Sequence, residues 1–124
     1  MRLYMIELQV GDLHKSVMWY QHFGWQVAML KPQDGFALLQ HGASRLALKQ
    51  RVAASEELPE RPTSRVRLHF EVSDLEQAIT TLAERGLTVC QPLKVSPEGY
   101  RRVLYHDPDG YEICLFEWLP SSTV

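Results

Sequence analysis

The chain has little cysteine, no long apolar run and no excess of charge of one sign. Only two of its 124 residues, Cys90 and Cys114, are cysteines, so neither a metal-type cysteine spacing nor a disulfide framework is predicted. The apolar runs are far shorter than a membrane span, and residues 1–8 lack the core of a signal peptide. The net charge is −2 with both signs mixed along the chain, which excludes a strongly basic nucleic-acid surface. We therefore expect one cytoplasmic domain, 1–124, without a membrane or nucleic-acid partner.

What the chain does have is a clear turn near its C-terminus. Asp-Pro-Asp-Gly at 107–110 supplies a proline for the second turn position, an aspartate that can cap the turn and a glycine that tolerates positive φ. The β-rich runs 102–105 and 111–118 on either side are therefore predicted to pair as a hairpin. Alternation puts one set of side chains on a common face of the second run: Glu112, Cys114 and Phe116.

The first half of the chain predicts one strand, one helix and three more strands. Residues 3–10 alternate apolar and polar, as a half-buried strand does. Asp12 is a suitable N-cap for a helix over 13–23, and Gly24 suits the left-handed position after its end. Three short strands are predicted to follow, near 25–30, 36–40 and 45–50.

The second half repeats the first. Superposition at an offset of 62 residues needs no gap and pairs Val10 with Val72 and Asp12 with Asp74. A repeat of this length predicts two βαβββ modules of an α+β fold. The modules span about 1–52 and 65–120, and the segment between them, about 51–64, has the proline-containing composition of a linker.

Three motifs in this order resemble the vicinal oxygen chelate superfamily, which includes glyoxalase I, bleomycin-resistance proteins and extradiol dioxygenases. They are ELQVGDLHKSVMWYQHFGW, FEVSDLEQAITTLAERGLTV and GYRRVLYHDPDGYEICLFE. The resemblance covers nearly the whole chain. It implies a mixed β-sheet curled into a cleft with the helices outside, a small organic ligand and a homodimer.

The resemblance also places the metal ligands of metal-dependent members on this chain. Two of those positions lie five residues before Val10 and Val72, and the other two are the middle residues of the closing apolar triplets, one in each module. The residues found there are Met5, Ala47, Arg67 and Cys114. A divalent cation in such a site needs imidazole and carboxylate ligands, and a permanently charged guanidinium repels it. We therefore expect no metal or other cofactor.

Strand alternation still directs polar and aromatic side chains toward the implied cleft. Our preferred interpretation is a ligand-binding cleft whose lining includes nine residues. They are Met5, Glu7, Arg67, His69, Tyr100, Arg102, Glu112, Cys114 and Phe116.

Two other interpretations of this face stay open. One is a solvated sheet face held by ion pairs such as Arg67 with Glu112. The other is a displaced metal site of Glu7, His69 and Glu112, which could hold Mn, Fe, Ni or Zn. Each of these three residues is two positions from an expected ligand, and such a step moves a side chain roughly 6–7 Å along a strand.

The preferred functional hypothesis from the sequence is a bleomycin-resistance-like binding protein that works by affinity, and whether it is also an enzyme stays open. Its ligand would be an aromatic or cationic compound, with Glu7, Glu71 and Glu112 available to neutralise a positive charge. The alternative is a metal-dependent glyoxalase-like lyase or isomerase, or a dioxygenase, that uses the displaced site. A purely structural or partner-binding role is a third class, against which the polar strand face argues.

Overall fold

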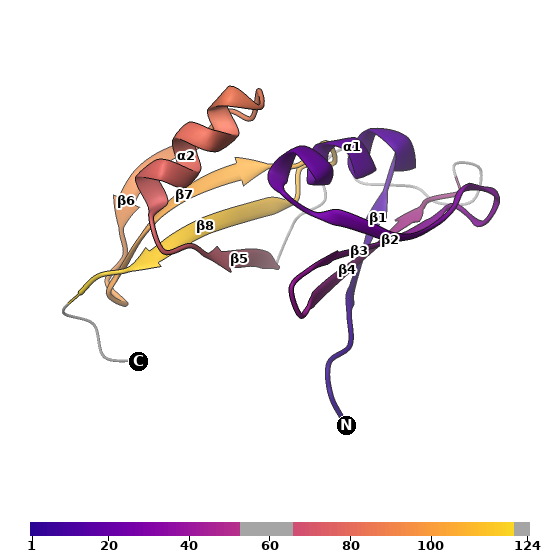
Figure 1. The fold of residues 1–124 in the computed structure, drawn as a ribbon, viewed down its shortest axis with the longest axis horizontal. Coiled ribbons are helices and arrows are strands. Elements are labelled where there is room, and N and C mark those ends of the chain that lie inside the picture. The colour runs from indigo at the N-terminus through magenta and orange to yellow at the C-terminus, as the bar shows by residue number, and fades with distance from the viewer. Residues whose placement is uncertain (53–65, 121–124) are drawn as a thin grey trace. The chain divides into compact units, whose positions relative to one another are not determined.

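The computed structural model describes residues 1–52 and 66–120 of the chain. These belong to two compact units, one within residues 1–62 and the other within 63–124. Each unit contains one helix and one open four-stranded mixed sheet, so the predicted α+β class and the two tandem βαβββ modules are confirmed (Figure 1). Apart from its first two residues, the predicted linker at 51–64 lies outside the described residues.

The first unit has the strand order β1-β4-β3-β2. β1 runs parallel to β4, and the other neighbours are antiparallel. Its elements are β1 (Ile6–Val10), α1 (Leu13–Phe23), β2 (Gln26–Lys31), the 3-10 helix η1 (Pro32–Asp34), β3 (Phe36–His41) and β4 (Ser44–Gln50).

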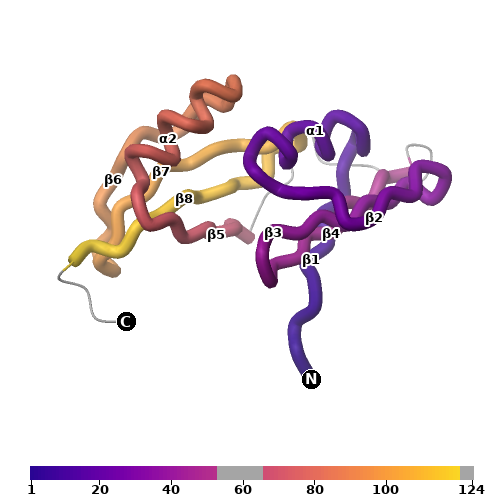
Figure 2. Tube along the Cα trace, viewed as in Figure 1, coloured from indigo at the N-terminus to yellow at the C-terminus, as the bar shows by residue number. Residues whose placement is uncertain are grey.

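The second unit has the same topology, with the strand order β5-β8-β7-β6 and a parallel β5–β8 pair. Its elements are β5 (Arg67–Glu71), α2 (Leu75–Glu84), β6 (Gln91–Val95), β7 (Tyr100–His106) and β8 (Glu112–Trp118). The trace in Figure 2 shows the same succession of strand, helix and three strands in both colour ranges.

In each unit the core lies between the helix and one face of the sheet. Val10, Leu39 and Leu48 of the first sheet are fully buried, as is Tyr20 of α1. In the second unit Val103, Ile113 and Leu115 point to the face that α2 covers, where Leu75 and Leu82 are buried. Because the apolar side chains alternate along the strands, they lie on one face of each sheet, and that face packs against the helix. The other face carries the polar residues.

Both helices begin with the same two contacts. The Asp12 and Asp74 carboxylates each accept a hydrogen bond of 3.1 Å from the backbone N–H three residues on, as N-caps do. The first helical N–H also donates to a side chain at the end of the closing strand. Leu13 N–H donates to Gln50 at 2.7 Å, and Leu75 N–H donates to Glu117 at 2.9 Å. The N-cap predicted at Asp12 is therefore confirmed, and its counterpart in the repeat, Asp74, caps the second helix in the same way.

The predicted hairpin at 107–110 is also present. Asp107 Oδ1 accepts hydrogen bonds from the N–H groups of Asp109 at 2.9 Å and Tyr111 at 2.8 Å. Gly110 has φ 88°, and its N–H donates to the Asp107 carbonyl. The aspartate therefore holds the turn closed, and β7 pairs with β8 over their whole lengths.

Two strands begin later than the pattern predicts. β1 begins at Ile6, not at residue 3, and Tyr4 is 48% exposed, with its ring against the Arg45 guanidinium at 4.5 Å. β6 begins at Gln91, so Val89 lies before the strand although its counterpart Val27 is inside β2. Pro92 has no N–H for the ladder, which an edge strand such as β6 tolerates.

Candidate functional site

The candidate site is the helix-free face of the second sheet, formed by the side chains that point away from α2. Strand register arranges them in rows that cross β7, β8 and β5. His106, Glu112 and Arg67 form the first row, and Leu104, Cys114 and His69 the second. Arg102, Phe116 and Glu71 form the third, and Tyr100 and Trp118 the fourth.

Four rings meet on this face and form what we call the aromatic cluster: His69, Tyr100, Phe116 and Trp118. The Phe116 ring centroid lies 5.1 Å from that of Tyr100, 5.4 Å from Trp118 and 5.9 Å from His69. Tyr100 also contacts Trp118 at 5.5 Å and His69 at 6.0 Å. The contacts are tilted or edge-on, which is the favoured geometry for aromatic pairs. Solvent still reaches all four rings, in contrast to the buried rings of Tyr20 and Tyr105.

An ion pair lies beside the aromatic cluster. Arg67 Nε and Nη2 donate to the two carboxylate oxygens of Glu112 at 3.3 and 3.4 Å. Both side chains are partly exposed, so the pair contributes little stability but neutralises both charges. This is the pair expected for a solvated sheet face, and it occupies the carboxylate that the displaced metal site requires.

His69 sits in a positive environment. Its partial burial, together with the guanidinium groups of Arg67 and Arg102, lowers its pKa from the ordinary 6.5, and Glu98 opposes the shift. The imidazole is therefore neutral at pH 7 and can donate one hydrogen bond and accept another.

Arg102 differs from the other two arginines of β5 and β7. Arg67 pairs with Glu112, while Arg101 on the helix-covered face pairs with Glu117 and Glu76 at 3.0 and 3.3 Å. Arg102 reaches only the neutral amide oxygen of Gln91, at 3.4 Å. Among the residues that the structure describes, it has no carboxylate partner.

Between the polar row and the aromatic cluster lies an apolar floor. Leu104 and Cys114 face each other across β7 and β8, and both are fully buried. Burial raises the pKa of the Cys114 thiol, so it stays protonated at neutral pH and is not an activated nucleophile.

The turn between β6 and β7 closes near the aromatic cluster. The Ser96 hydroxyl donates to the Glu98 carboxylate, and this bond lowers the pKa of Glu98. Gly99 has φ 100° and donates to the Ser96 carbonyl. Tyr100, the first residue of β7, is thereby positioned beside Trp118.

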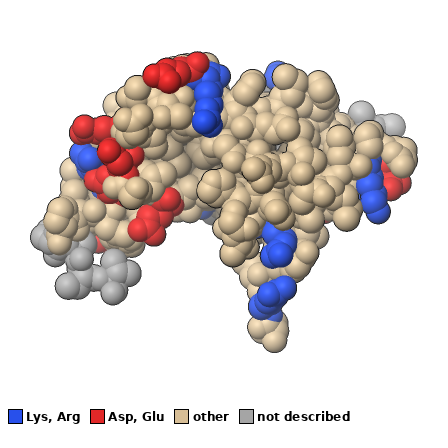
Figure 3. Space-filling view, viewed as in Figure 1, with Lys and Arg blue, Asp and Glu red and all other residues tan. Residues whose placement is uncertain are grey.

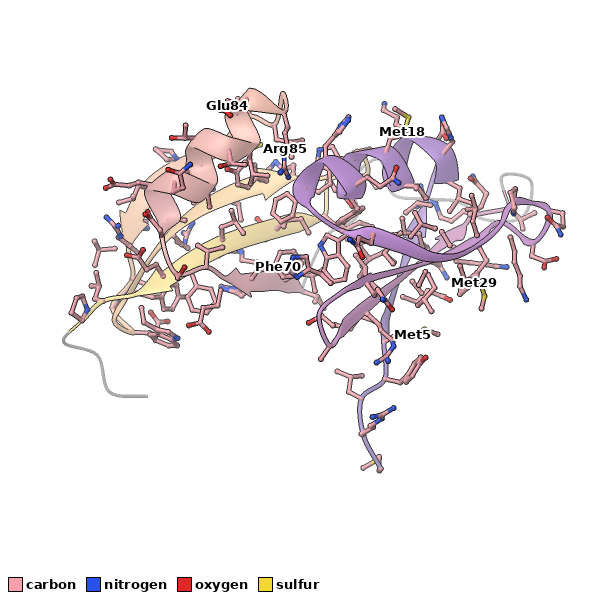
Figure 4. All side chains as sticks on the ribbon, in the orientation of Figure 1. Met5, Met18, Met29, Phe70, Glu84 and Arg85 are labelled. Atoms are coloured by element: carbon pink, nitrogen blue, oxygen red, sulfur yellow. The ribbon has the colours of Figure 1, made fainter. Side chains whose placement is uncertain are left out.

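The helix-free face of the first sheet has different residues at equivalent positions. Glu7 pairs with Ala47 there, where the second unit pairs His69 with Cys114. Phe36 faces Lys49, and the Lys49 ammonium donates to the Asp34 carbonyl at 2.6 Å. Met5 precedes β1 and is 37% exposed (Figure 4).

These residues do not fit the metal that the resemblance implies. The expected ligand positions hold a thioether at Met5, a methyl group at Ala47 and a guanidinium at Arg67 that is already paired with Glu112. The fourth is the protonated, buried thiol of Cys114. Within either unit, the described residues include no group of three or more histidine, cysteine or acidic side chains that could hold an ion. Of the displaced set, Glu7 belongs to one unit and His69 and Glu112 to the other.

Figure 3 shows side chains of both charge signs on the face that it draws. Acidic groups gather mainly on the left of that view, while basic groups are spread more widely. Neither helix in residues 1–52 and 66–120 combines the length and the apolar character that a bilayer span requires.

The structure brings most of the predicted site residues onto one face. Seven of the nine lie on the helix-free face of the second unit: Arg67, His69, Tyr100, Arg102, Glu112, Cys114 and Phe116. Met5 and Glu7 lie in the first unit. Sequence reasoning left out Trp118, which completes the aromatic cluster. The signal was present, because Trp118 continues the alternation of Cys114 and Phe116 along β8.

Solved structures share this fold. A glyoxalase/bleomycin resistance protein/dioxygenase from Nocardioides has 24% identity and a TM-score of 0.79, over 99% of this chain and 87% of that one. TioX from Micromonospora sp. ML1 has 21% identity and a TM-score of 0.73, over 95% and 100%. A lactoylglutathione lyase from Agrobacterium tumefaciens has 20% identity and a TM-score of 0.70, over 94% and 92%.

Among proteins with curated descriptions, none matches this chain. The family profile described as Glyoxalase/Bleomycin resistance protein/Dioxygenase superfamily matches residues 2–115, nearly the whole sequence. On the strength of that match, the protein belongs to the glyoxalase/bleomycin resistance protein/dioxygenase superfamily.

Proposed function

We propose that the protein binds a small, flat organic molecule on the helix-free face of its second unit and works by affinity alone. The observation that carries this proposal is the aromatic cluster. Four rings, each in contact with at least two of the others, remain within reach of solvent on a sheet face that no described helix of the unit covers. His69 is exposed and the other three residues are partly exposed, so the cluster offers ring surface against which an aromatic ligand can stack.

The polar residues around the cluster suit a binding role better than metal catalysis. Glu112 is held by Arg67, and a dication beside that guanidinium would be repelled. His69, neutral at pH 7, can orient a ligand by one hydrogen bond. Among the residues described in this unit, no set of metal donors favours the metal-dependent lyase or dioxygenase alternative.

The test is to titrate the full chain with 2-naphthamide, a neutral two-ring probe, and follow backbone amide signals by NMR. We expect saturable shifts at the aromatic-cluster residues on β5, β7 and β8. Phe116→Leu should weaken binding about threefold to tenfold, because one aromatic contact contributes about 0.5–1.5 kcal/mol beyond its buried area.

The matched control is Phe70→Leu, on the helix-covered face of the same sheet (Figure 4), which should leave the affinity unchanged. Absence of saturable binding, or shifts confined to other elements, would disprove the proposed site.

We further propose that the protein is a cytoplasmic homodimer. Both cysteines are free thiols, as is usual in a reducing compartment. The edge strands β2 and β6 expose apolar side chains that a second chain could cover: Met29, Leu30, Leu93 and Val95. Sedimentation of the purified protein as a 14.3 kDa species would rule out the dimer.

A further inference from the structure

The charges beside the aromatic cluster are not balanced. Arg102 lies directly opposite Phe116, and Lys94 lies directly opposite Arg102 on β6. Two cations are therefore neighbours across the β6–β7 ladder, an arrangement that is unfavourable unless something negative lies near them.

The nearby carboxylates do not meet this need. Glu112 is engaged by Arg67. Glu98 keeps its charge while it accepts the Ser96 hydroxyl, but among the described residues it forms no ion pair with Arg102 or Lys94. Glu71 is in the same row as Arg102 but on the far side of Phe116, roughly 10 Å away across two strand spacings. At that separation solvent and salt screen most of its attraction for Arg102.

We propose that Arg102 and Lys94 form an anion subsite at the edge of the aromatic cluster, so that the preferred ligand is a planar aromatic compound with a carboxylate or similar anionic group. This rests on the proposed binding function and names the class of ligand. The guanidinium of Arg102 can donate two parallel hydrogen bonds to a carboxylate, while the ring of the ligand lies against Phe116 and its neighbours.

This assignment reverses the sign of charge expected from the sequence, in which Glu7, Glu71 and Glu112 suggested a cationic ligand. The difference arises from pairing. In the second unit Glu112 is neutralised by Arg67, whereas Arg102 and its neighbour Lys94 have no carboxylate partner among the described residues. Glu71 also has no ion pair among them, but it stands alone on the far side of Phe116. What matters for a ligand is therefore which charges the fold leaves uncompensated.

The test compares three probes that share one ring system: neutral 2-naphthamide, anionic 2-naphthoate and cationic 2-naphthylmethylammonium. Dissociation constants are measured on the full chain at low and moderate salt. We expect 2-naphthoate to bind about tenfold more tightly than the ammonium probe, as charge-assisted hydrogen bonds allow. The preference should shrink as salt rises, because the subsite is partly exposed.

Two variants test whether Arg102 and Lys94 cause the preference for 2-naphthoate over the ammonium probe. Arg102→Gln should remove most of it and leave the affinity for 2-naphthamide unchanged, while Lys94→Gln should reduce it in part. Arg85→Gln, which removes one positive charge at the end of α2 (Figure 4), is the control and should change nothing.

The outcomes separate the two proposals. If 2-naphthamide binds but the ammonium probe binds as tightly as 2-naphthoate, the anion subsite is wrong and the binding function stands. The same conclusion follows if Arg102→Gln keeps the full preference for the anion. If none of the three probes binds, the proposed function is wrong, and the anion subsite is wrong with it.

Discussion

At the scale of single residues, the pKa of His69 depends on the charged groups of the candidate site. It is flanked by Arg67 on its own strand, by Glu112 two positions along the neighbouring β8, by Arg102 on β7 and by Glu98 in the turn before β7. The two guanidinium groups and partial burial outweigh Glu98, so the pKa of His69 is lowered from 6.5.

We predict that NMR titration of His69 gives a midpoint below 6.5, and that Arg102→Gln moves it upward. The unfolded chain binds this proton more readily than the folded one, so folding stability should fall as pH drops from 6.5 through the lowered value. A midpoint above 6.5 would mean that carboxylates dominate this face.

At the scale of elements, each module fastens its helix to the end of its closing strand. Gln50 does this with a neutral amide, which also donates to the Gly11 carbonyl. Glu117 does it with a carboxylate that binds Arg101 as well. The Leu75 N–H and Arg101 both favour the ionised form, so the pKa of Glu117 is lowered from 4.5.

We predict that Glu117→Ala lowers the melting temperature more than Glu117→Gln, because glutamine keeps an acceptor for Leu75, as Gln50 does for Leu13. A group with a depressed folded-state pKa stabilises above its unfolded value, and the contribution is lost as pH falls. The advantage of the native chain over Glu117→Gln should therefore be full above pH 4.5 and be lost as the pH falls from 4.5 through the lowered pKa of Glu117. Thermal melts across pH measure this, and a constant difference would contradict it.

At the scale of the whole molecule, the two modules share one topology but differ in the side chains on their helix-free faces. Equivalent ladder positions hold Phe36 opposite Lys49 in the first unit and Arg102 opposite Phe116 in the second. In the first unit the aromatic residue is on β3 and the cation on the closing strand β4. In the second unit the cation is on β7, the equivalent of β3, and the aromatic residue is on the closing strand β8. Only the helix-free face is free to vary in this way, because the other face must pack against the helix.

We predict that protein purified without a metal-affinity tag contains far less than one metal ion per chain by elemental analysis. The reason is the donor chemistry at Met5, Ala47, Arg67 and Cys114, which suits no divalent cation. His69→Ala serves as the control and should give the same low value. Near-stoichiometric metal that disappears in His69→Ala would favour the displaced Glu7, His69 and Glu112 site and a metal-dependent enzyme.

The sequence by itself determined the modules and their local structure. Asp12, Asp74 and the turn at 107–110 act within a few residues of chain, and strand alternation assigns each side chain to a face. The α+β class and seven of the residues on the candidate face were predictable for that reason.

Only the tertiary structure decided which side chains on that face meet. The pair of Arg67 with Glu112 was among the interactions suggested by the sequence. The register between β5, β7 and β8, which joins residues far apart in the chain, is what selects it and leaves Arg102 without Glu112. The same register brings Trp118 beside Tyr100 and leaves Arg102 next to Lys94. Alternation along one strand does not say which residues of the adjacent strands lie opposite. The charge next to a bound ligand is therefore decided only when the sheet has formed.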